Sequence, residues 1–219
     1  MKATISADIV RSTSLTTEDL LKLRNGLRRF FQDMGEVFPD FWARIVRGDS
    51  IECVVPDYKD ALRIAILIKL YVKMRVSEFE CSDMLRRYGI RFSIGVADLK
   101  YADRDEDIIN GQAIYISGRN LDEISRKENA MTAFEADPLF VSMNNLLDSY
   151  VAMIGNLVDS YSAKQATVIY YKLLGFKEKD ISERLGVYQS SVNTRASLAH
   201  WGLLHTAIKD FECLKLEDL

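Results

Sequence analysis

Histidine and cysteine are scarce in this chain of 219 residues, which contains two histidines and three cysteines. The histidines, His200 and His205, lie five positions apart, a spacing that does not bring two metal ligands to one face of a helix. The cysteines, Cys53, Cys81 and Cys213, are odd in number and widely spaced. They fit reduced thiols in a cytoplasm and argue against both a disulfide framework and a zinc site.

A long hydrophobic run and a strong net charge are also missing. The longest apolar run, Ala65 to Leu70, is interrupted by Lys69, and the opening MKATISADIV has no apolar signal segment. We therefore expect no membrane partner, no export and a cytoplasmic location. The net charge of −3 provides no general attraction to nucleic acid, so any DNA binding must come from a local patch.

The composition, with 48% hydrophobic and 28% charged residues, is typical of a folded globular protein, and the length allows two modest domains with separate cores. Up to about residue 135, β-rich runs and amphipathic stripes alternate in the order β-α-β-β-α-β, followed by a further helix and strand. This order predicts an α+β domain of the ferredoxin-like (split βαβ) type. The expected strands are 3–10, Phe41–Val46, Ile51–Val55, Ile90–Val96 and Met131–Phe134, and the expected helices are Thr17–Val37, Asp57–Val76 and the segment that follows Gly111.

No strand is expected from Pro138 onward. Leu139 to about Asp159 is predicted to form a connecting helix, and the remainder an all-helical unit. The predicted division is therefore 1–137 for the α+β domain, 138–160 for the connection and 161–219 for the helical domain.

Two aspartates stand out on the predicted sheet. Asp8 lies in the first strand, and Asp49 lies at the tip of the hairpin between the next two strands. In a split βαβ sheet the first strand is central and neighbours the hairpin, so the two carboxylates can approach each other. Such a pair suits Mg²⁺ or Mn²⁺, ions whose coordination shell is completed by substrate phosphates. The segment from Ile9 to Ser14 would offer backbone N–H groups as a phosphate cradle.

Four short segments resemble the signature stretches of class III nucleotidyl cyclase domains. They are ISADIVRSTSL, RGDSIECVV, YGIRFSIGVADL and NGQAIYISGRNLDEI, in the same order and at similar spacings, and they cover roughly residues 3–135. The chain resembles the SatD-like group more closely, in which a similar domain is followed by a helix-turn-helix. The resemblance implies a metal held by Asp8 and Asp49, a nucleotide ligand, a homodimer, and Arg119 as the residue that stabilises charge on the transferring phosphate.

The chain departs from the cyclase pattern at the positions that read the base. Tyr115 replaces the asparagine expected four residues before Arg119. Ile45 replaces the base-reading lysine, with Arg44 one position away, and Ile108 replaces the base-reading aspartate, with Asp107 adjacent. A nucleotide would therefore be expected to meet Ile9, Arg11, Ser12, Thr13, Arg44, Asp107 and Tyr115. The alternative is that both aspartates are ordinary turn residues and that Arg119 forms a surface ion pair.

The C-terminal segment has the pattern of a helix-turn-helix. Ser162 and Gln165 form a capping box that opens a helix ending near Leu174, and a short helix over 179–185 ends at Gly186. A third helix is expected from Gln189 to Trp201, and in the longer alternative onward to Phe211. The residues expected to face inward are Ile181, Leu185, Val187, Val192 and Leu198. The spacing resembles that of sigma-factor and LuxR-type regulators, with Tyr188 where a capping Ser or Thr is usual.

A third helix of this kind is presented to the major groove of DNA. Short polar side chains on its outer face could reach base edges, and nearby basic side chains could meet phosphates. The first set is Gln189, Ser190, Asn193 and Thr194, and the second is Lys177, Lys179 and Arg195. Residues 161–219 contain eight basic and seven acidic residues, a net charge of +1, so a dimer on two half-sites is expected to be needed. A purely structural helical unit is the alternative.

Three functions remain open from the sequence. The first is a DNA-binding transcriptional regulator with a degenerate cyclase-like domain for dimerisation or nucleotide sensing. The second is an active nucleotidyl cyclase, and the third is a non-enzymatic interaction scaffold. A fold hosts many activities, so the resemblance does not decide among them.

Overall fold

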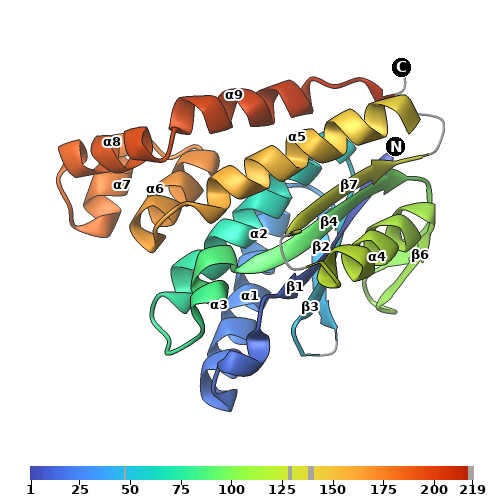
Figure 1. Ribbon diagram of the computed structural model, residues 1–219, viewed down its shortest axis with the longest axis horizontal. Helices are drawn as coiled ribbons and strands as arrows, with labels where there is room; N and C mark the ends of the chain where they lie inside the picture. Colours follow the sequence, from blue (N-terminus) through green and yellow to red (C-terminus); the bar gives the residue numbers. More distant parts are fainter. Residues whose placement is uncertain (47, 128–129, 138–140, 217–219) are drawn as a thin grey trace.

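The computed structural model describes residues 1–46, 48–127, 130–137 and 141–216. The protein is a mixed α+β structure in which helices cover a five-stranded sheet (Figure 1). Among the described residues, no helix combines the length and the apolar character needed to cross a membrane. The α+β class that the sequence predicts is confirmed.

The sheet has the strand order β2-β3-β1-β4-β7. Its strands are β1 (Lys2–Ile9), β2 (Trp42–Val46), β3 (Ser50–Val55), β4 (Ile90–Ala97) and β7 (Thr132–Ala136). Neighbouring strands pair antiparallel, except that β7 runs parallel to β4. The five predicted strands are therefore all present, with bounds shifted by one or two residues.

One face of the sheet contains the main hydrophobic core. Alternate residues of β1, among them Ile5 and Ile9, point into this core, as the two-residue period of a strand requires. Helices α1 (Thr17–Val37) and α2 (Ala61–Val76) cover this face, α1 with the predicted stripe that includes Leu23, Leu27 and Phe30. A short 3-10 helix, η2 (Tyr58–Asp60), precedes α2.

The opposite face carries polar side chains and helix α4 (Gln112–Ser125). The hydroxyls of Thr4 and Ser6 on β1 both hydrogen-bond to Ser117 of α4, at 2.9 and 2.8 Å. Helix α4 approaches β4 very closely, since a Cβ atom at Gly95 would lie 2.4 Å from the carbonyl oxygen of Ala113. Asp8 belongs to this polar face because it follows Thr4 and Ser6 at two-residue steps.

One helix and one hairpin in the α+β part were not predicted from the sequence. Helix α3 (Asp83–Tyr88) precedes β4, and a separate two-stranded hairpin, β5 (Leu99–Asp103) with β6 (Ile108–Gly111), occupies the acidic stretch. Most of the hairpin side chains are exposed or half-buried, so its strands lack the alternation of apolar and polar residues that would reveal them.

The C-terminal part is helical, as predicted. Its helices are α5 (Val141–Asp159), α6 (Ala163–Leu173), α7 (Glu178–Leu185), α8 (Gln189–Leu198) and α9 (Trp201–Glu212). Leu139, where the sequence predicts the connecting helix to begin, lies outside the described residues, as do the limits 138 and 219 of the predicted domains. Helix α5 runs along β7, and α9 lies beyond it (Figure 1).

Helices α6, α7 and α8 share a small core of Val168, Ile181, Val192 and Ala196, with Leu185 and Val187 partly buried against it. The inward assignment of Leu198 was wrong, because this side chain is 65% exposed. Helix α8 ends at Leu198 and not at Trp201, since His200 adopts the left-handed conformation (φ 50°) and starts α9 in a new direction. Helix α6 also packs against α2, so the main core continues from the sheet into the C-terminal helices.

Candidate functional site

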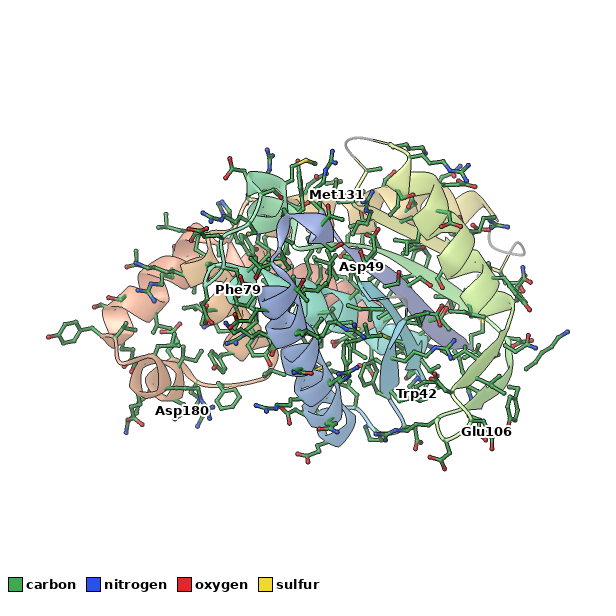
Figure 2. All side chains as sticks on the ribbon, turned by 90° about the horizontal axis from the view of Figure 1, so that it is seen from below. Trp42, Asp49, Phe79, Glu106, Met131 and Asp180 are labelled. Atoms are coloured by element: carbon green, nitrogen blue, oxygen red, sulfur yellow. The ribbon has the colours of Figure 1, made fainter. Side chains whose placement is uncertain are left out.

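Asp8 and Asp49 line the same cavity, which has a volume of about 650 Å³ and lies at one end of the sheet. Figure 2 shows Asp49 and Met131, which also lines the cavity, near each other in the upper middle of the view. The cavity lies where β1 ends and the β2–β3 hairpin turns, with the last turn of α4 forming another wall. The structure therefore brings together the two aspartates that the sequence predicted to converge.

Asp8 is held by a cation from the neighbouring strand. Its Oδ1 atom accepts a hydrogen bond from Nε of Arg91 at 2.8 Å, and Arg91 also donates to the carbonyl of Ser125 at the end of α4. Burial raises the pKa of Asp8; the charge and hydrogen bond of Arg91 oppose this shift, and the negative charge of Asp49 adds to it. The carboxylate of Asp8 is therefore poorly solvated and lies within the field of a second carboxylate.

Asp49 connects the hairpin to the segment that follows β1. Its Oδ2 atom accepts a hydrogen bond from the Ser12 hydroxyl at 2.6 Å, and its backbone carbonyl accepts one from the N–H of Ile9 at 3.2 Å. The turn is possible because Gly48 adopts a positive φ of 91°. These bonds fix the position of Asp49 relative to Asp8.

The predicted phosphate cradle lies along the same cavity. Ile9, Arg11, Ser12 and Thr13 all line it. Arg11 adopts the left-handed backbone conformation (φ 51°, ψ 41°), which is unfavourable for residues other than glycine. It immediately precedes the short 3-10 helix η1 (Ser12–Ser14). Strain of this kind at a cavity is a feature of binding sites.

The residues fit a divalent cation that is shared with a phosphate ligand. Within the described part of the chain, Oδ2 of Asp8 and Oδ1 of Asp49 accept no hydrogen bond, so each carboxylate keeps an oxygen for a metal. No group of three acidic, histidine or cysteine side chains suited to a metal occurs among the described residues. A cation bound here would therefore need water and ligand oxygens to complete its shell, which is the usual situation of Mg²⁺.

The cavity is more cationic than anionic. Besides the two aspartates it is lined by Arg11, Arg91, Arg126 and Lys127. Cationic side chains around a pair of carboxylates suit a metal–phosphate complex better than a bare cation, because the phosphate charge is then balanced as well.

Arg119 lies outside this cavity. Its guanidinium donates to both carboxylate oxygens of Glu135 on β7, at 2.9 and 2.7 Å, and Asn120 donates to the same side chain at 2.9 Å. Within one chain the structure therefore does not bring Arg119 to Asp8 and Asp49.

Arg44 and Asp107 meet each other, but they do not line the cavity either. Arg44 donates to Glu52 through Nε at 2.8 Å and through Nη2 at 2.6 Å, and it also contacts the carboxylate and the backbone carbonyl of Asp107. This contact holds the β5–β6 hairpin over β2. Tyr115 is exposed on α4, where its hydroxyl lies 3.3 Å from Oδ1 of Asn110. The base-reading part of the predicted site is thus dispersed within one chain.

The predicted DNA contacts lie at the start of α7 and along α8, and most of them are exposed. Gln189, Ser190, Asn193 and Thr194 are exposed, as are Lys177 and Lys179, and Arg195 is half-buried. Gly186 ends α7 in the left-handed conformation (φ 63°), as predicted. Tyr188 is the N-cap residue of α8, but its side chain makes no capping hydrogen bond and is 84% exposed.

Sequence reasoning missed a buried charged cluster behind the cavity. Lys69 of α2 forms an ion pair with Asp159 at 2.7 Å, and both side chains are almost completely buried. The neighbouring Lys73 is also buried. The signal was present in the sequence, since Lys69 interrupts the apolar run from Ala65 to Leu70, where a charge survives only with a partner.

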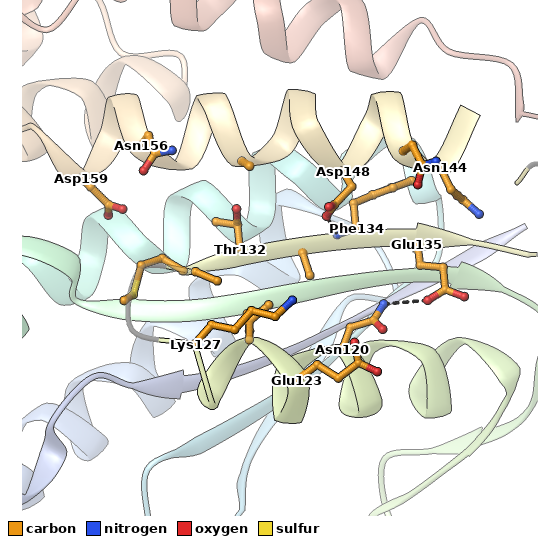
Figure 3. A pocket seen from close by; sticks show the side chains of 16 residues that line it. Asn120, Glu123, Lys127, Thr132, Phe134, Glu135, Asn144, Asp148, Asn156 and Asp159 are labelled. Carbon is orange, nitrogen blue, oxygen red and sulfur yellow. Dashed lines mark hydrogen bonds between the residues drawn. The ribbon is translucent and has the colours of Figure 1, made fainter. Parts of the chain in front are cut away.

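A second hollow, of about 550 Å³, lies between α4 and α5 along β7 (Figure 3). Two side chains of α5 satisfy the free edge of this strand: Asp148 accepts from the N–H of Phe134, and Asn144 both accepts from and donates to the backbone of Ala136. Uncovered edge strands promote aggregation, so these contacts explain the polar face of α5 without a ligand.

The chain matches no protein-family model, no curated protein and no solved structure at significant similarity.

Proposed function

We propose that this protein is a DNA-binding regulator whose α+β part binds a nucleotide together with a divalent metal ion. The observation that carries the proposal is the convergence of Asp8 and Asp49 in one cavity that is also lined by four cationic side chains. The metal would be Mg²⁺ or Mn²⁺, held by the two aspartates, with the segment from Ile9 to Thr13 and the cationic side chains facing the phosphates.

The strand order supports a ferredoxin-like relationship for the α+β part. In the order β2-β3-β1-β4, the connections through α1 and α2 pass over one face of an antiparallel sheet, which is the split βαβ arrangement. This agrees with the proposed kinship to class III cyclase domains and to the SatD-like group, in which β7 and α4 would be additions to the basic unit.

The C-terminal helices support DNA binding. Helix α7, the turn at Gly186 and helix α8 pack on α6 around Val192 and Ile181, and the opposite side of α8 stays exposed and polar. This leaves Asn193 and its neighbours free to enter a major groove as a recognition helix. The net charge of only +1 over residues 161–219 favours a homodimer, since one copy would make few phosphate contacts.

A selection of DNA fragments bound by the purified protein tests the proposal. The selected DNA should bind wild-type protein and the control variant Lys100→Ala alike, because Lys100 lies on the distant β5–β6 hairpin. Asn193→Ala should weaken binding by about 1–3 kcal/mol and relax the sequence preference. Lys179→Ala should instead reduce the slope of log DNA affinity against log salt concentration by about one. Failure to select any DNA, at low salt and at concentrations that favour dimers, would contradict DNA binding.

An active nucleotidyl cyclase is the second candidate, and the paired aspartates favour it. The position of Arg119 on Glu135 disfavours it within one chain, although a partner chain could supply such a residue. Incubation with ATP or GTP and Mn²⁺ distinguishes the two: cyclic product that disappears in Asp49→Ala would establish the enzyme, and its absence alongside nucleotide binding would favour a sensor.

A further inference from the structure

Four successive carbonyl groups of the α3–β4 connection each accept a hydrogen bond. The carbonyl of Arg87 accepts from Nζ of Lys73, and those of Tyr88 and Ile90 accept from Nζ of Lys69 at 2.8 and 2.7 Å. The carbonyl of Gly89 accepts from the N–H of Val10 at 3.0 Å. This connection, residues 87–90, is therefore clamped between α2 on one side and the cradle of the Asp8–Asp49 cavity on the other.

The same two lysines also hold the last residue of α5. Nζ of Lys69 lies 2.7 Å from the carboxylate of Asp159, and Nζ of Lys73 donates to the Asp159 backbone carbonyl at 3.2 Å. Asp159 is followed almost at once by Ser162, the N-cap of α6, which is the helix that supports α7 and α8. One cluster thus touches both the back of the cavity and the start of the C-terminal helical unit.

The fit around this cluster is tight. Gly89 has a positive φ of 65°, and a Cβ atom there would lie 3.1 Å from Cγ of Lys73. Lys69 is fully buried and Asp159 is 5% exposed. Burial lowers the pKa of Lys69 and raises that of Asp159, and each charge opposes the shift of the other. The buried side chains of Lys69 and Asp159 cannot move independently of each other, because a small displacement would leave one charge buried without its partner.

The cluster is joined directly to the cavity. Arg91, the residue after the clamped connection, is the partner of Asp8, and Val10 follows Asp8 by two positions. A ligand that breaks the Asp8–Arg91 ion pair, or that changes the conformation of the segment from Ile9 to Ser14, therefore displaces residues 87–90.

We infer that the Lys69–Lys73–Asp159 cluster couples the Asp8–Asp49 cavity to helices α6–α8. The inference rests on the proposed function, in which a ligand at the cavity controls the DNA-binding helices. Coupling between two places is reciprocal, so a disturbance at either end should be felt at the other even without a ligand. That property allows a test that does not depend on nucleotide binding.

Residue-resolved amide hydrogen exchange of the full chain tests the coupling in both directions. Asp159→Asn lowers the stability of the whole fold and so speeds all slow amides; the Val10 amide should speed up about fivefold more than the slow amides of α1, as expected for a local opening made easier by a further ~1 kcal/mol. In the other direction, Asp8→Asn should speed exchange of the Ala166 amide, which bonds to the Ser162 carbonyl in the first turn of α6. Asp8 lies at the cavity, so this second variant keeps the test valid if Asp159→Asn fails to fold.

Arg63→Met is the matched control. Arg63 also projects from α2 and donates to the Leu173 carbonyl of α6, but it does not contact residues 87–90. Arg63→Met should leave the exchange rate of the Val10 amide unchanged. Unchanged Ala166 exchange in Asp8→Asn, or equal acceleration of every slow amide in Asp159→Asn, would overturn the coupling.

A fluorescence experiment separates the coupling from the proposed function. Trp42→Phe leaves Trp201 as the single tryptophan, with its ring 5.3 Å from Nζ of Lys172 on α6. In this background Mn²⁺ with ATP or GTP should change the Trp201 emission, and ligand binding itself is followed by calorimetry. Binding without any change in emission would overturn the coupling and leave the nucleotide site standing. Absent binding would contradict the proposed function, while the exchange experiment would still decide the coupling.

Discussion

Arg91 and Asp8 face each other across the central strands β1 and β4, with Nε of Arg91 2.8 Å from Oδ1 of Asp8. The pair lines the cavity of the proposed metal site, which would need the same carboxylate. Arg91 favours the ionised form of Asp8 against the effect of burial, which by itself raises the pKa of this carboxyl.

The first prediction concerns the pH dependence of metal binding. Arg91→Met removes the cation that lowers the pKa of Asp8, so Asp8 should be protonated at a higher pH. A carboxyl group binds a metal only when ionised, and the pH midpoint for Mn²⁺ binding should therefore move upward. Titrations followed by electron paramagnetic resonance between about pH 4 and 8 measure the midpoint. Arg104→Met, on the distant β5–β6 turn, is the control, and an unchanged or lower midpoint in Arg91→Met would contradict the role of this pair.

The second prediction contrasts two aspartates. Asp159→Asn leaves Lys69 as a buried charge without a partner and should lower the free energy of unfolding by about 3–5 kcal/mol. Asp8→Asn should change it by less than about 1 kcal/mol, because loss of the bond to Arg91 is offset by removal of a poorly solvated carboxylate. Urea denaturation of both variants provides the comparison. Similar losses in the two variants would show that Asp8 is as structural as Asp159.

The third prediction follows from the pKa of Lys73, which burial lowers from 10.5 to about 8. The folded state binds this proton less tightly than the unfolded state. Lys73 therefore lowers stability below about pH 8, and the loss is recovered as the pH rises from about 8 to 10.5, by up to about 3 kcal/mol. Unfolding free energies of wild type and Lys73→Met at pH 7.5 and 9.5 test the sign. A wild type that gains no stability relative to Lys73→Met over this range would refute it.

The strands and the main helices could be predicted from the sequence because their apolar residues follow simple periods. The stripe of α1 and the alternation of β1 both reflect burial against one core. The β5–β6 hairpin escaped prediction because its side chains lie at the surface, where burial imposes no pattern. Leu198 was misplaced because the left-handed turn at His200, which redirects the chain, has no signal in the local residues.

The candidate site was predictable in part. The approach of Asp8 and Asp49 follows from strand order, which the sequence indicates through the positions of its hairpin and helices. The partners of Arg44 and Arg119 do not follow, because Asp107 and Glu135 come from elements whose side-chain directions depend on packing. Lys69 could have been found, but its partner Asp159, ninety positions later, could not.

The fourth prediction concerns the first residue of the exposed helix. Tyr188 has the extended backbone of an N-cap residue but offers no capping oxygen to the α8 amides. Tyr188→Ser should therefore stabilise the protein by about 0.5–1 kcal/mol in thermal denaturation. If Tyr188 contacts DNA, the same change should weaken binding to selected DNA. A gain in stability with unchanged DNA affinity would remove Tyr188 from the contact surface.

Binding of Mn²⁺ in the presence of ATP or GTP, measured by electron paramagnetic resonance, tests the central claim most directly. Wild type and the control variant Asp33→Asn, altered at an exposed carboxylate of α1, should bind the ion equally. Asp8→Asn and Asp49→Asn should each weaken binding by at least about tenfold while the fold is retained. Equal affinity in all four proteins, or no nucleotide-dependent binding in wild type, would contradict a metal–nucleotide site at these two aspartates.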